Sequence, residues 1–337
     1  MPRRVNLQVG LLGGGSWGTT VAALVARNAP VTLWARNADT VREINEDHTN
    51  SRYLPDSNLP PSLQATTDIE EAISGADVVV MGIPSQSFRG VLADVAQYVR
   101  PWVPVVSLTK GLEVESRLRM TEIIAQELPG HPVGVLTGPN LAREIMSGQA
   151  AASVIAMDDE IIIKELQRLF QSGLFRCYTN DDVIGCELGG VLKNIIAIAV
   201  GMGDGQGAGD NTRAALITRG LAEMSRLGVA LGGRPETFAG LAGMGDMIAT
   251  CVSPQSRNRH VGVELAKGLE IHEVIDKMVM VAEGVKTAPA VMSLAQEHDI
   301  SMPISEEVFR MVSGESSAKN ALRVLLRIAA GSESDPG

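Results

Sequence analysis

The sequence predicts an α/β protein with a doubly wound parallel sheet in its N-terminal half and an all-α domain in its C-terminal half. Two observations support this fold class. Short β-branched runs alternate with helical segments up to about Asn180, as in a sheet built from βαβ units. After about Asp181 these runs stop, and helical segments closed by Gly or Pro follow one another. We therefore expect one domain over residues 1–181, a helical domain over 182–330 and a disordered tail over 331–337.

The expected elements can be assigned in chain order. The strands are the seven runs VNLQVGLLG, PVTLW, ADVVVMGIP, VPVVSLT, HPVGVLTGP, ASVIA and FRCYT. A long apolar helix from about Asp182 to Val200 follows directly, because no Pro/Ser-rich linker separates the two halves. The later helices are NTRAALITRGLAEMSRLG, QSRNRHVGVELAKG, KTAPAVMSLAQEH, PISEEVFRMVSG and AKNALRVLLRIAAG. The glycine-rich stretch GMGDGQGAGDN is interpreted as a flexible connector.

The composition argues against several classes of protein. A formal net charge of -10 and a pI near 5.1 disfavour nucleic acid and anionic membrane surfaces as partners. The N-terminal apolar run is interrupted by glycines and lacks a signal-peptide cleavage pattern, so we expect a cytoplasmic protein. The apolar stretch around Lys193 is well short of the about 20 residues of a membrane span, which favours burial in protein. The three cysteines are widely spaced and indicate neither a disulfide framework nor a zinc site.

A glycine-rich loop follows the first expected strand. In LQVGLLGGGSWGTTVAALVAR, Gly13, Gly15 and Gly18 form GxGxxG between that strand and an apolar helix. The first glycine permits a tight turn, the second lets a pyrophosphate approach the backbone, and the third lets the helix pack on the strand. In this position the motif predicts dinucleotide binding and a Rossmann-like domain.

The second expected strand ends near Arg36, where NAD-binding versions of this fold usually carry Asp or Glu for the ribose hydroxyls. A carboxylate there would repel a 2′-phosphate, whereas Arg36 can pair with one and stack on adenine. This position therefore indicates that NADPH is accepted. The alternative is a solvated arginine at a strand end.

Cations occupy the first turn of the helix expected over residues 256–267, with Ser256 as its N-cap. The helix dipole disfavours Arg257 and Arg259 at that end unless an anion lies between them. Arg257 and Asn258, together with free backbone N–H groups, would form a phosphate cradle. A fully hydrated turn explains the same residues, and the segment alone leaves both interpretations open.

Polar residues also follow two expected strands. Lys110 comes after one of them, while Gly138 and Pro139 end another, with Asn140 as the expected cap of the next helix. The carboxyl ends of parallel strands share one edge of the sheet, so these residues predict a ligand crevice there. Asp246 in AGMGDMIATC is interpreted either as an ordinary helix N-cap or as a site residue.

Lys193 stands alone in the apolar run GGVLKNIIAIAVG. A buried lysine without partners is costly, so two interpretations remain. The side chain either extends to solvent, or it faces a crevice between domains near Lys110 and the arginines, with a lowered pKa suited to proton transfer.

Eight stretches closely resemble the bacterial-type NAD(P)-dependent glycerol-3-phosphate dehydrogenases, in the family's order and over nearly the whole chain. They are GGGSWGT, SLTKGLE, GPNLARE, GGVLKNIIAIAVG, GDNTRAALITRGLAEM, AGMGDM, SRNRHVG and AEGVKTAPAV. The resemblance implies reversible reduction of dihydroxyacetone phosphate to sn-glycerol 3-phosphate, the backbone of glycerophospholipids, with NADPH or NADH as cofactor and a homodimer as the assembly.

The resemblance also implies roles for individual residues. The implied catalytic residues are Lys193, which transfers the proton, and Lys110, which contacts both cofactor and substrate. The implied cofactor-binding residues are Gly13, Gly15, Ser16, Trp17, Gly18, Arg36, Lys110, Ala142, Arg257, Val281 and Glu283. The implied substrate-binding residues are Lys110, Gly138, Asn140, Lys193, Asp246, Ser256, Arg257 and Asn258. The family usually shows Ser or Thr where this chain has Asn140, so that contact departs from the pattern.

Two other functions fit parts of the sequence. A different two-domain β-hydroxyacid-type dehydrogenase or ketopantoate-like reductase shares the glycine loop and a helical second domain. A non-catalytic dinucleotide sensor would need the glycine loop but not Lys110, Lys193 and the SRN segment together. We expect a small-molecule substrate and no metal.

Overall fold

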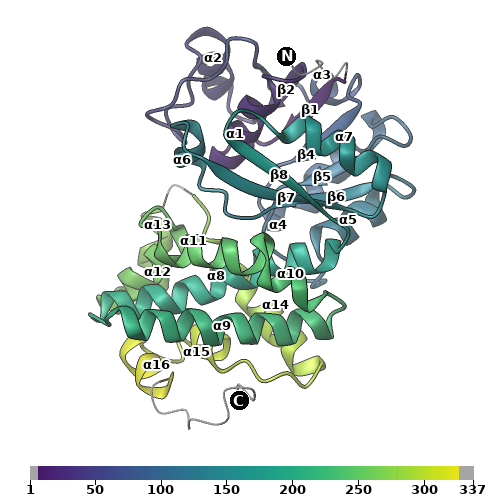
Figure 1. Cartoon of the computed structure of the whole chain (residues 1–337). Coiled ribbons are helices and arrows are strands. Elements are labelled where there is room, and N and C mark those ends of the chain that lie inside the picture. The colour runs from purple at the N-terminus through teal and green to yellow at the C-terminus, as the bar shows by residue number, and fades with distance from the viewer. Residues whose placement is uncertain (1–6, 279, 326–337) are drawn as a thin grey trace. The chain divides into compact units, whose positions relative to one another are not determined.

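The computed structural model describes residues 7–278 and 280–325, which divide into two compact units (Figure 1). Unit 1 comprises residues up to Thr109 together with Arg119–Val183, and unit 2 comprises Lys110–Leu118 and the chain from Ile184 onward. Each unit is described by itself below.

Unit 1 is built on an eight-stranded sheet with the order β3-β2-β1-β4-β5-β6-β7-β8. Its strands are β1 Val9–Leu12, β2 Val31–Trp34, β3 Gln64–Thr66, β4 Val78–Met81, β5 Val105–Ser107, β6 Val133–Thr137, β7 Ala151–Met157 and β8 Phe175–Asn180. Because β1 pairs with both β2 and β4, the direction of winding reverses beside β1. Ligands bind at such a switch point in open α/β sheets.

The doubly wound sheet is confirmed, with two differences from the predicted strands. β7 pairs antiparallel with β6, so the sheet is predominantly rather than wholly parallel. The connection between them, residues 138–150, contains the short helix α6, Ala142–Met146. The three-residue strand β3 was not expected, because QAT carries no run of β-branched residues.

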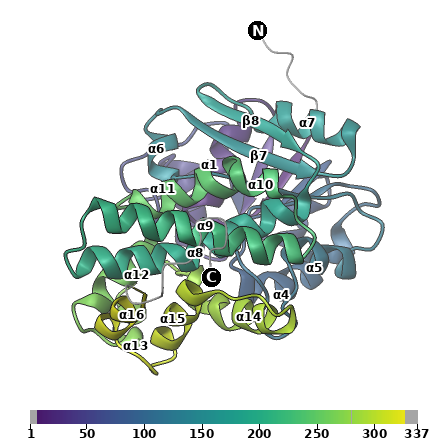
Figure 2. The same ribbon diagram turned by 60° about the horizontal axis from the view of Figure 1, so that its bottom comes forward.

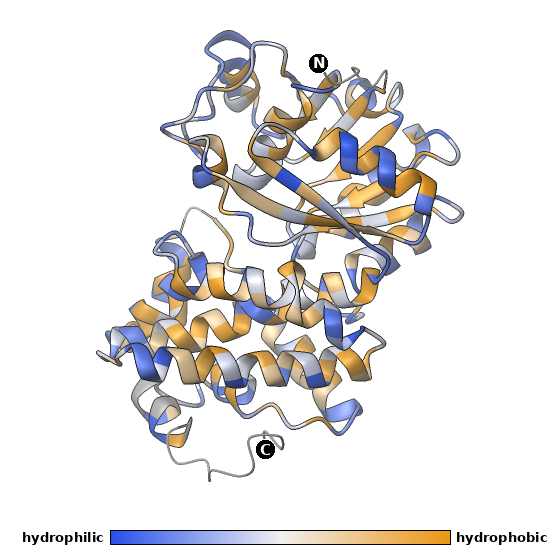
Figure 3. Ribbon diagram, viewed as in Figure 1, coloured by the Kyte–Doolittle hydropathy of each residue, from blue (hydrophilic) through white to orange (hydrophobic). Residues whose placement is uncertain are grey.

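Helices cover both faces of the sheet. Those of unit 1 are α1 Ser16–Val25, α2 Ala38–Glu46, α3 Ile69–Ile73, α4 Ser85–Val95, the 3₁₀ turn Ala96–Tyr98, α5 Met120–Glu127, α6 Ala142–Met146 and α7 Glu160–Phe170. Helix α1 lies over one face, where it contacts α7, and α4 and α5 lie together over the other (Figure 1). Covered on both faces, the central strands are mostly hydrophobic (Figure 3).

Unit 2 is all-α, as expected, apart from the short loop segment from Lys110 to Leu118. Its helices are α8 Val183–Gly205, α9 Asp210–Ala230, α10 Pro235–Ala239, the π-helix Leu241–Gly245, α11 Asp246–Val252, α12 Arg257–Ala266, α13 Ile271–Asp276, α14 Glu283–Glu297, α15 Pro303–Val312 and α16 Ala318–Leu325. The expected disordered tail over 331–337 lies outside the described residues.

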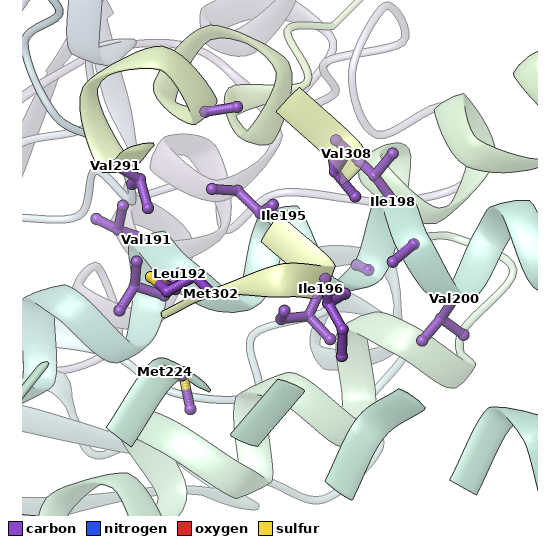
Figure 4. Packing of buried hydrophobic residues seen from close by; sticks show 14 of the residues in the cluster. Val191, Leu192, Ile195, Ile196, Ile198, Val200, Met224, Val291, Met302 and Val308 are labelled. Carbon is purple, nitrogen blue, oxygen red and sulfur yellow. The ribbon is translucent and has the colours of Figure 1, made fainter. Parts of the chain in front are cut away.

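Helix α8 forms the centre of unit 2, with α9 alongside it (Figure 2). Ile195, Ile196 and Ile198 are at most 1% exposed and pack among apolar side chains from α9, α14 and α15, such as Met224 and Val308 (Figure 4). The sequence underestimated this helix, which has 23 residues and is long and apolar enough to cross a membrane. However, 89% of its most apolar stretch is buried inside the protein, as in a core helix.

The interpretation of GMGDGQGAGDN as a flexible connector is wrong for residues 201–205 and 210–211, which are helical, whereas residues 206–209 connect α8 and α9. Residues 201–205 are the last turn of α8, where α12 passes in close contact. A Cβ on Gly201 would lie 2.0 Å from the Arg259 carbonyl oxygen, and one on Gly262 would lie 2.1 Å from the Ile198 carbonyl oxygen. These glycines therefore serve close helix packing, because any side chain would push α8 and α12 apart.

Residues 110–118 belong to unit 2 because of specific contacts. Arg117 Nη1 donates to Glu297 Oε2 of α14 at 2.5 Å, and Asn194 Nδ2 of α8 donates to the Lys110 carbonyl at 3.3 Å. Leu112 is 1% exposed and belongs to the apolar core of unit 2. The loop after β5 thus carries Lys110 into the helical unit.

Candidate functional site

The glycine loop has the geometry that its spacing predicts. Gly13 adopts φ +120°, a conformation that L side chains rarely adopt, and a Cβ there would lie 2.4 Å from the Gly82 carbonyl oxygen. A Cβ on Gly18 would lie 2.0 Å from the Gly13 carbonyl oxygen, so only glycine lets α1 start so close to β1. No atom lies within 4 Å of the position that a Cβ on Gly15 would take, so a ligand has room to approach the backbone there.

The N-terminus of α1 fits an anionic group. Gly15 is its N-cap, no side chain caps the helix, and the first turn contains no acidic residue. The first N–H groups are therefore free for a pyrophosphate, which the helix dipole also favours. Ser16 is the first residue of α1. Trp17 follows, and its buried Nε1 has no hydrogen-bond acceptor among the described residues.

Arg36 lies two residues beyond the end of β2 and is exposed. The next residue, Asn37, caps α2 by accepting a hydrogen bond from Thr40 N at 2.9 Å. The arginine thus leaves the carboxyl end of its strand beside a helix N-terminus, with its guanidinium available to an anion.

The segment after β6 carries three further predicted residues. Gly138 adopts φ +119° and packs against the backbone of Ser153 on β7. The expectation that Asn140 caps α6 is wrong, because Leu141 is the N-cap and Ala142 is the first residue of the helix. Instead, Asn140 Oδ1 accepts a hydrogen bond from Ser153 Oγ, and the buried Asn140 Nδ2 has no acceptor among the described residues.

In unit 2, Lys193 lies at the centre of a buried ionic cluster. Its side chain does not extend to solvent, because the residue is only 5% exposed. Nζ donates to Asp246 Oδ1 at 2.7 Å and to Thr250 Oγ1 at 2.5 Å. The other Asp246 oxygen, Oδ2, accepts from Lys110 Nζ at 2.7 Å. One carboxylate therefore joins the two lysines, which are 83 positions apart in the sequence.

Asp246 is not the N-cap of its helix. Gly245 precedes α11 at that position, and the Asp246 carboxylate, 1% exposed, faces the lysines. The cluster carries two positive charges against one negative charge. Burial lowers the pKa of Lys110 to about 8, Asp246 opposes this shift, and the charges of Lys193 and Arg257 add to it.

The first turn of α12 contains residues with different roles. Ser256 is the N-cap, as predicted, and its Oγ accepts from Arg259 N at 3.2 Å. Arg259 pairs with the largely buried Asp204 at the end of α8, with Nε 2.7 Å from Oδ2, and Asp204 also pairs with Arg213. Arg257 is exposed, and its Nη1 donates to the Val281 carbonyl at 2.8 Å. Of the two arginines, Arg257 is therefore the better candidate to bind an anion, because Arg259 is held in a salt bridge.

Asn258 takes part in a chain of buried amides. Its Nδ2 donates to Asn194 Oδ1 at 2.9 Å, and its Oδ1 accepts from Gly284 N at 3.0 Å. Glu283, the residue immediately before Gly284, is the first residue of α14. These bonds use the Asn258 carbonyl and one N–H, which leaves a single amide proton for a ligand.

Comparison with known proteins identifies the family. A model described as the N-terminus of NAD-dependent glycerol-3-phosphate dehydrogenase matches residues 8–162, and one for its C-terminus matches residues 182–323. This chain belongs to the NAD-dependent glycerol-3-phosphate dehydrogenase family. Together, the two models match most of both halves of the chain.

Individual members of the glycerol-3-phosphate dehydrogenase family are similar over nearly their full length. A glycerol-3-phosphate dehydrogenase [NAD(P)+] 2 of Sphingopyxis alaskensis is 67% identical over 99% of this chain and 100% of the relative. A glycerol-3-phosphate dehydrogenase [NAD(P)+] of Mycobacterium avium is 54% identical over 97% of this chain and 96% of the relative. The crystal structure of the Coxiella burnetii enzyme is 37% identical, with a TM-score of 0.92 over 96% of this chain and 99% of that one.

Within this glycerol-3-phosphate dehydrogenase fold, two residues of the ionic cluster and its surroundings were missed by the sequence analysis. Thr250 lies four positions after Asp246 on α11, so both side chains share one face of that helix. Asn194 directly follows Lys193 and contacts both the Lys110 carbonyl and Asn258. Polar residues at spacing four in the apolar segment GDMIATC were the available signal for Thr250.

Proposed function

We propose that this chain catalyses the reversible NAD(P)-dependent reduction of dihydroxyacetone phosphate to sn-glycerol 3-phosphate. The observation that carries the proposal is the buried cluster in which Asp246 joins Lys193 and Lys110. The names of the relatives, which are glycerol-3-phosphate dehydrogenases [NAD(P)+], support the same reaction.

The dinucleotide is assigned to unit 1. Gly13, Gly15 and Gly18 would shape the loop, and the N–H groups at Ser16 and Trp17 would bind the pyrophosphate. Arg36 would pair with the 2′-phosphate of NADPH and does not prevent the binding of NADH. Further cofactor contacts are proposed for Lys110, Ala142, Arg257, Val281 and Glu283. When bound, the reduced nicotinamide supplies a hydride to the ketone carbon.

The substrate is assigned to the cationic residues of unit 2. Arg257 and the remaining N–H of Asn258 would hold the phosphate, and Ser256 would present its hydroxyl as a donor. Gly138 and Asn140 of unit 1 are proposed as further substrate contacts. Binding energy from the phosphate would hold the ketone at reacting distance.

Lys193 is proposed to donate a proton to the ketone oxygen during reduction and to accept that proton during the reverse reaction. Two of its ammonium protons are engaged by Asp246 and Thr250, so the third has a defined direction. The positive charge of Lys110 would stabilise the negative charge that develops on the same oxygen. Asp246 would orient both lysines without reacting.

The wider setting is also proposed. Glycerophospholipid synthesis is the expected use of the product, the cytoplasm the expected location, and a homodimer the expected assembly. Light scattering at working concentration tests the dimer, and a monomer would contradict it.

The experiment that tests the reaction is a pair of initial-rate measurements with dihydroxyacetone phosphate. NADPH and NADH are supplied separately, and loss of nicotinamide absorbance is followed. Rapid oxidation is expected with NADPH, and the ratio of the two rates reports on Arg36. No oxidation with either cofactor, in protein shown to be folded, would reject the proposed function.

A further inference from the structure

A buried asparagine outside the predicted site donates a hydrogen bond to the backbone of the glycine loop. Asn50 follows α2 in the segment HTNSRYLP and is 0% exposed. Its own backbone is secured by a turn, in which the Asn50 carbonyl accepts from Leu54 N at 2.8 Å. Leu54 is also 0% exposed, so the asparagine is attached to a fixed part of unit 1.

Both N–H groups of the Asn50 carboxamide donate hydrogen bonds to the glycine loop and the helix that follows it, α1. Nδ2 donates to the Gly14 carbonyl at 3.0 Å and to Thr19 Oγ1 of α1 at 2.9 Å. Oδ1 is buried and has no donor among the described residues. Bonding to the Gly14 carbonyl requires a donor, so this asparagine contributes its nitrogen rather than its oxygen.

The bond to Gly14 also determines the direction of the next N–H. The Gly14 carbonyl and the Gly15 N–H belong to one planar trans peptide, so they point in opposite directions. Because the Gly14 carbonyl points toward Asn50, the Gly15 N–H points away from Asn50. As the N-cap, Gly15 has no intrahelical acceptor for this N–H, and no atom lies within 4 Å of the position that a Cβ on Gly15 would take.

Without the hydrogen bond from Asn50, the orientation of the Gly14–Gly15 peptide would be poorly restrained. Two neighbouring glycines, Gly14 and Gly15, have little steric resistance to rotation of the peptide between them. A rotated peptide would present a carbonyl oxygen to the pyrophosphate and repel it. A fixed hydrogen bond from a buried side chain prevents that rotation.

We propose that Asn50 is a positioning residue for the dinucleotide, and that it acts by orienting the Gly14–Gly15 peptide toward the pyrophosphate. This inference rests on the proposed function. It predicts an effect specific to ligands that contain a pyrophosphate, since the Asn50 side chain donates its hydrogen bonds to the loop and α1.

The test compares dissociation constants of the full-length Asn50→Ala variant and the wild type for two probes. NADPH contains the pyrophosphate, whereas 2′-AMP carries the adenine and 2′-phosphate without it. NADPH affinity is measured by nicotinamide fluorescence and 2′-AMP affinity by calorimetry, below the unfolding transition. We expect NADPH to bind about tenfold more weakly and 2′-AMP to change less than about twofold.

Asn45→Ala is the matched control. Asn45 also makes two backbone hydrogen bonds, to the carbonyl and N–H of Ala65 on β3, but it does not touch the glycine loop. It should leave both constants unchanged. Steady-state rates provide a further readout, because Asn50→Ala should raise the KM for NADPH while kcat at saturating cofactor stays within about threefold.

Several results would overturn the inference. Unchanged NADPH binding, or equal losses for NADPH and 2′-AMP, would show that Asn50 does not act through the pyrophosphate. If Asn50→Ala does not fold, the same constants for Asn50→Asp decide, because its carboxylate presents an acceptor to the Gly14 carbonyl. A wild-type protein that binds neither probe would instead reject the proposed function, and this inference with it.

Discussion

At the scale of single residues, the buried ionic cluster explains a lysine in an apolar helix. Lys193 avoids the cost of an unpaired buried charge because Asp246 and Thr250 accept hydrogen bonds from its ammonium group. Removing Asp246 would leave two buried ammonium groups without their shared carboxylate, so this member of the cluster is especially sensitive to substitution.

We expect Lys193→Met to lower turnover about a hundredfold or more, because the proton donor is lost while the length of the side chain is kept. NADPH affinity should change little, since the glycine loop belongs to unit 1. Steady-state kinetics and nicotinamide fluorescence measure the two quantities. Lys267→Met, at an exposed lysine of the same unit, is the control. Retained turnover would remove Lys193 from the chemistry.

Lys110 should make substrate binding depend on pH. Its pKa is lowered to about 8, so the side chain is charged below that pH and loses its charge above it. The substrate phosphate is already fully ionised there, because its second pKa is about 6. The KM for dihydroxyacetone phosphate should therefore rise between pH 7.5 and 9.5 in the wild type. In Lys110→Arg, which stays charged, the rise should be absent; parallel profiles would contradict this assignment.

At the scale of elements, close contact between α8 and α12 links the lysine helix to the helix that begins with Arg257. Gly201 and Gly262 allow the backbones to meet, and Asp204 pairs with Arg259 at the same crossing. The two helices therefore hold their functional side chains in a fixed relation.

Gly201→Ala should destabilise unit 2 by about 2 kcal/mol, because the added Cβ would overlap the Arg259 carbonyl and force the helices apart. Gly209→Ala, in the same glycine-rich stretch, has no atom within 4 Å of the added Cβ and a φ of -81°, so it should cost no more than the about 1 kcal/mol that separates glycine from alanine at a helix N-cap. Denaturant unfolding measures both. Equal effects would restore the interpretation of this stretch as a connector.

At the scale of the whole molecule, each unit has its own apolar core, and a buried carboxylate joins helices of unit 2 that are distant in sequence. Glu223 on α9 accepts from Ile304 N at 2.6 Å, and from Ser305 N at 3.1 Å, at the start of α15. Burial raises its pKa to about 7, against the lowering effect of these hydrogen bonds.

The raised pKa of Glu223 predicts how stability changes with pH. Because the folded-state pKa lies above the unfolded value near 4.5, its contribution is present at low pH and disappears as pH rises through about 7. Relative to Glu223→Gln, the wild type should lose about 2 kcal/mol of unfolding free energy between pH 5 and pH 8. Glu236→Gln, at an exposed position of α10, is the control, and identical pH profiles for wild type and Glu223→Gln would refute the prediction.

The sequence by itself determined the features that depend on local conformation. GxGxxG after a strand requires a tight turn and close helix packing whatever the rest of the chain does, and Ser256 caps α12 through a residue three positions away. Alternating β-branched and helical runs likewise predicted the two halves of the fold, because local periodicity reflects which face is buried.

Only the tertiary structure decided which distant groups meet. Asp246 binds residues 53 and 136 positions away, and either partner alone is compatible with an ordinary helix cap or a solvated lysine. The tertiary structure alone also decided the direction of β7, the packing of Gly201 against α12 and the hydrogen bond from Asn50 to Gly14. Each depends on where another element lies in space, and neither spacing nor composition carries that information.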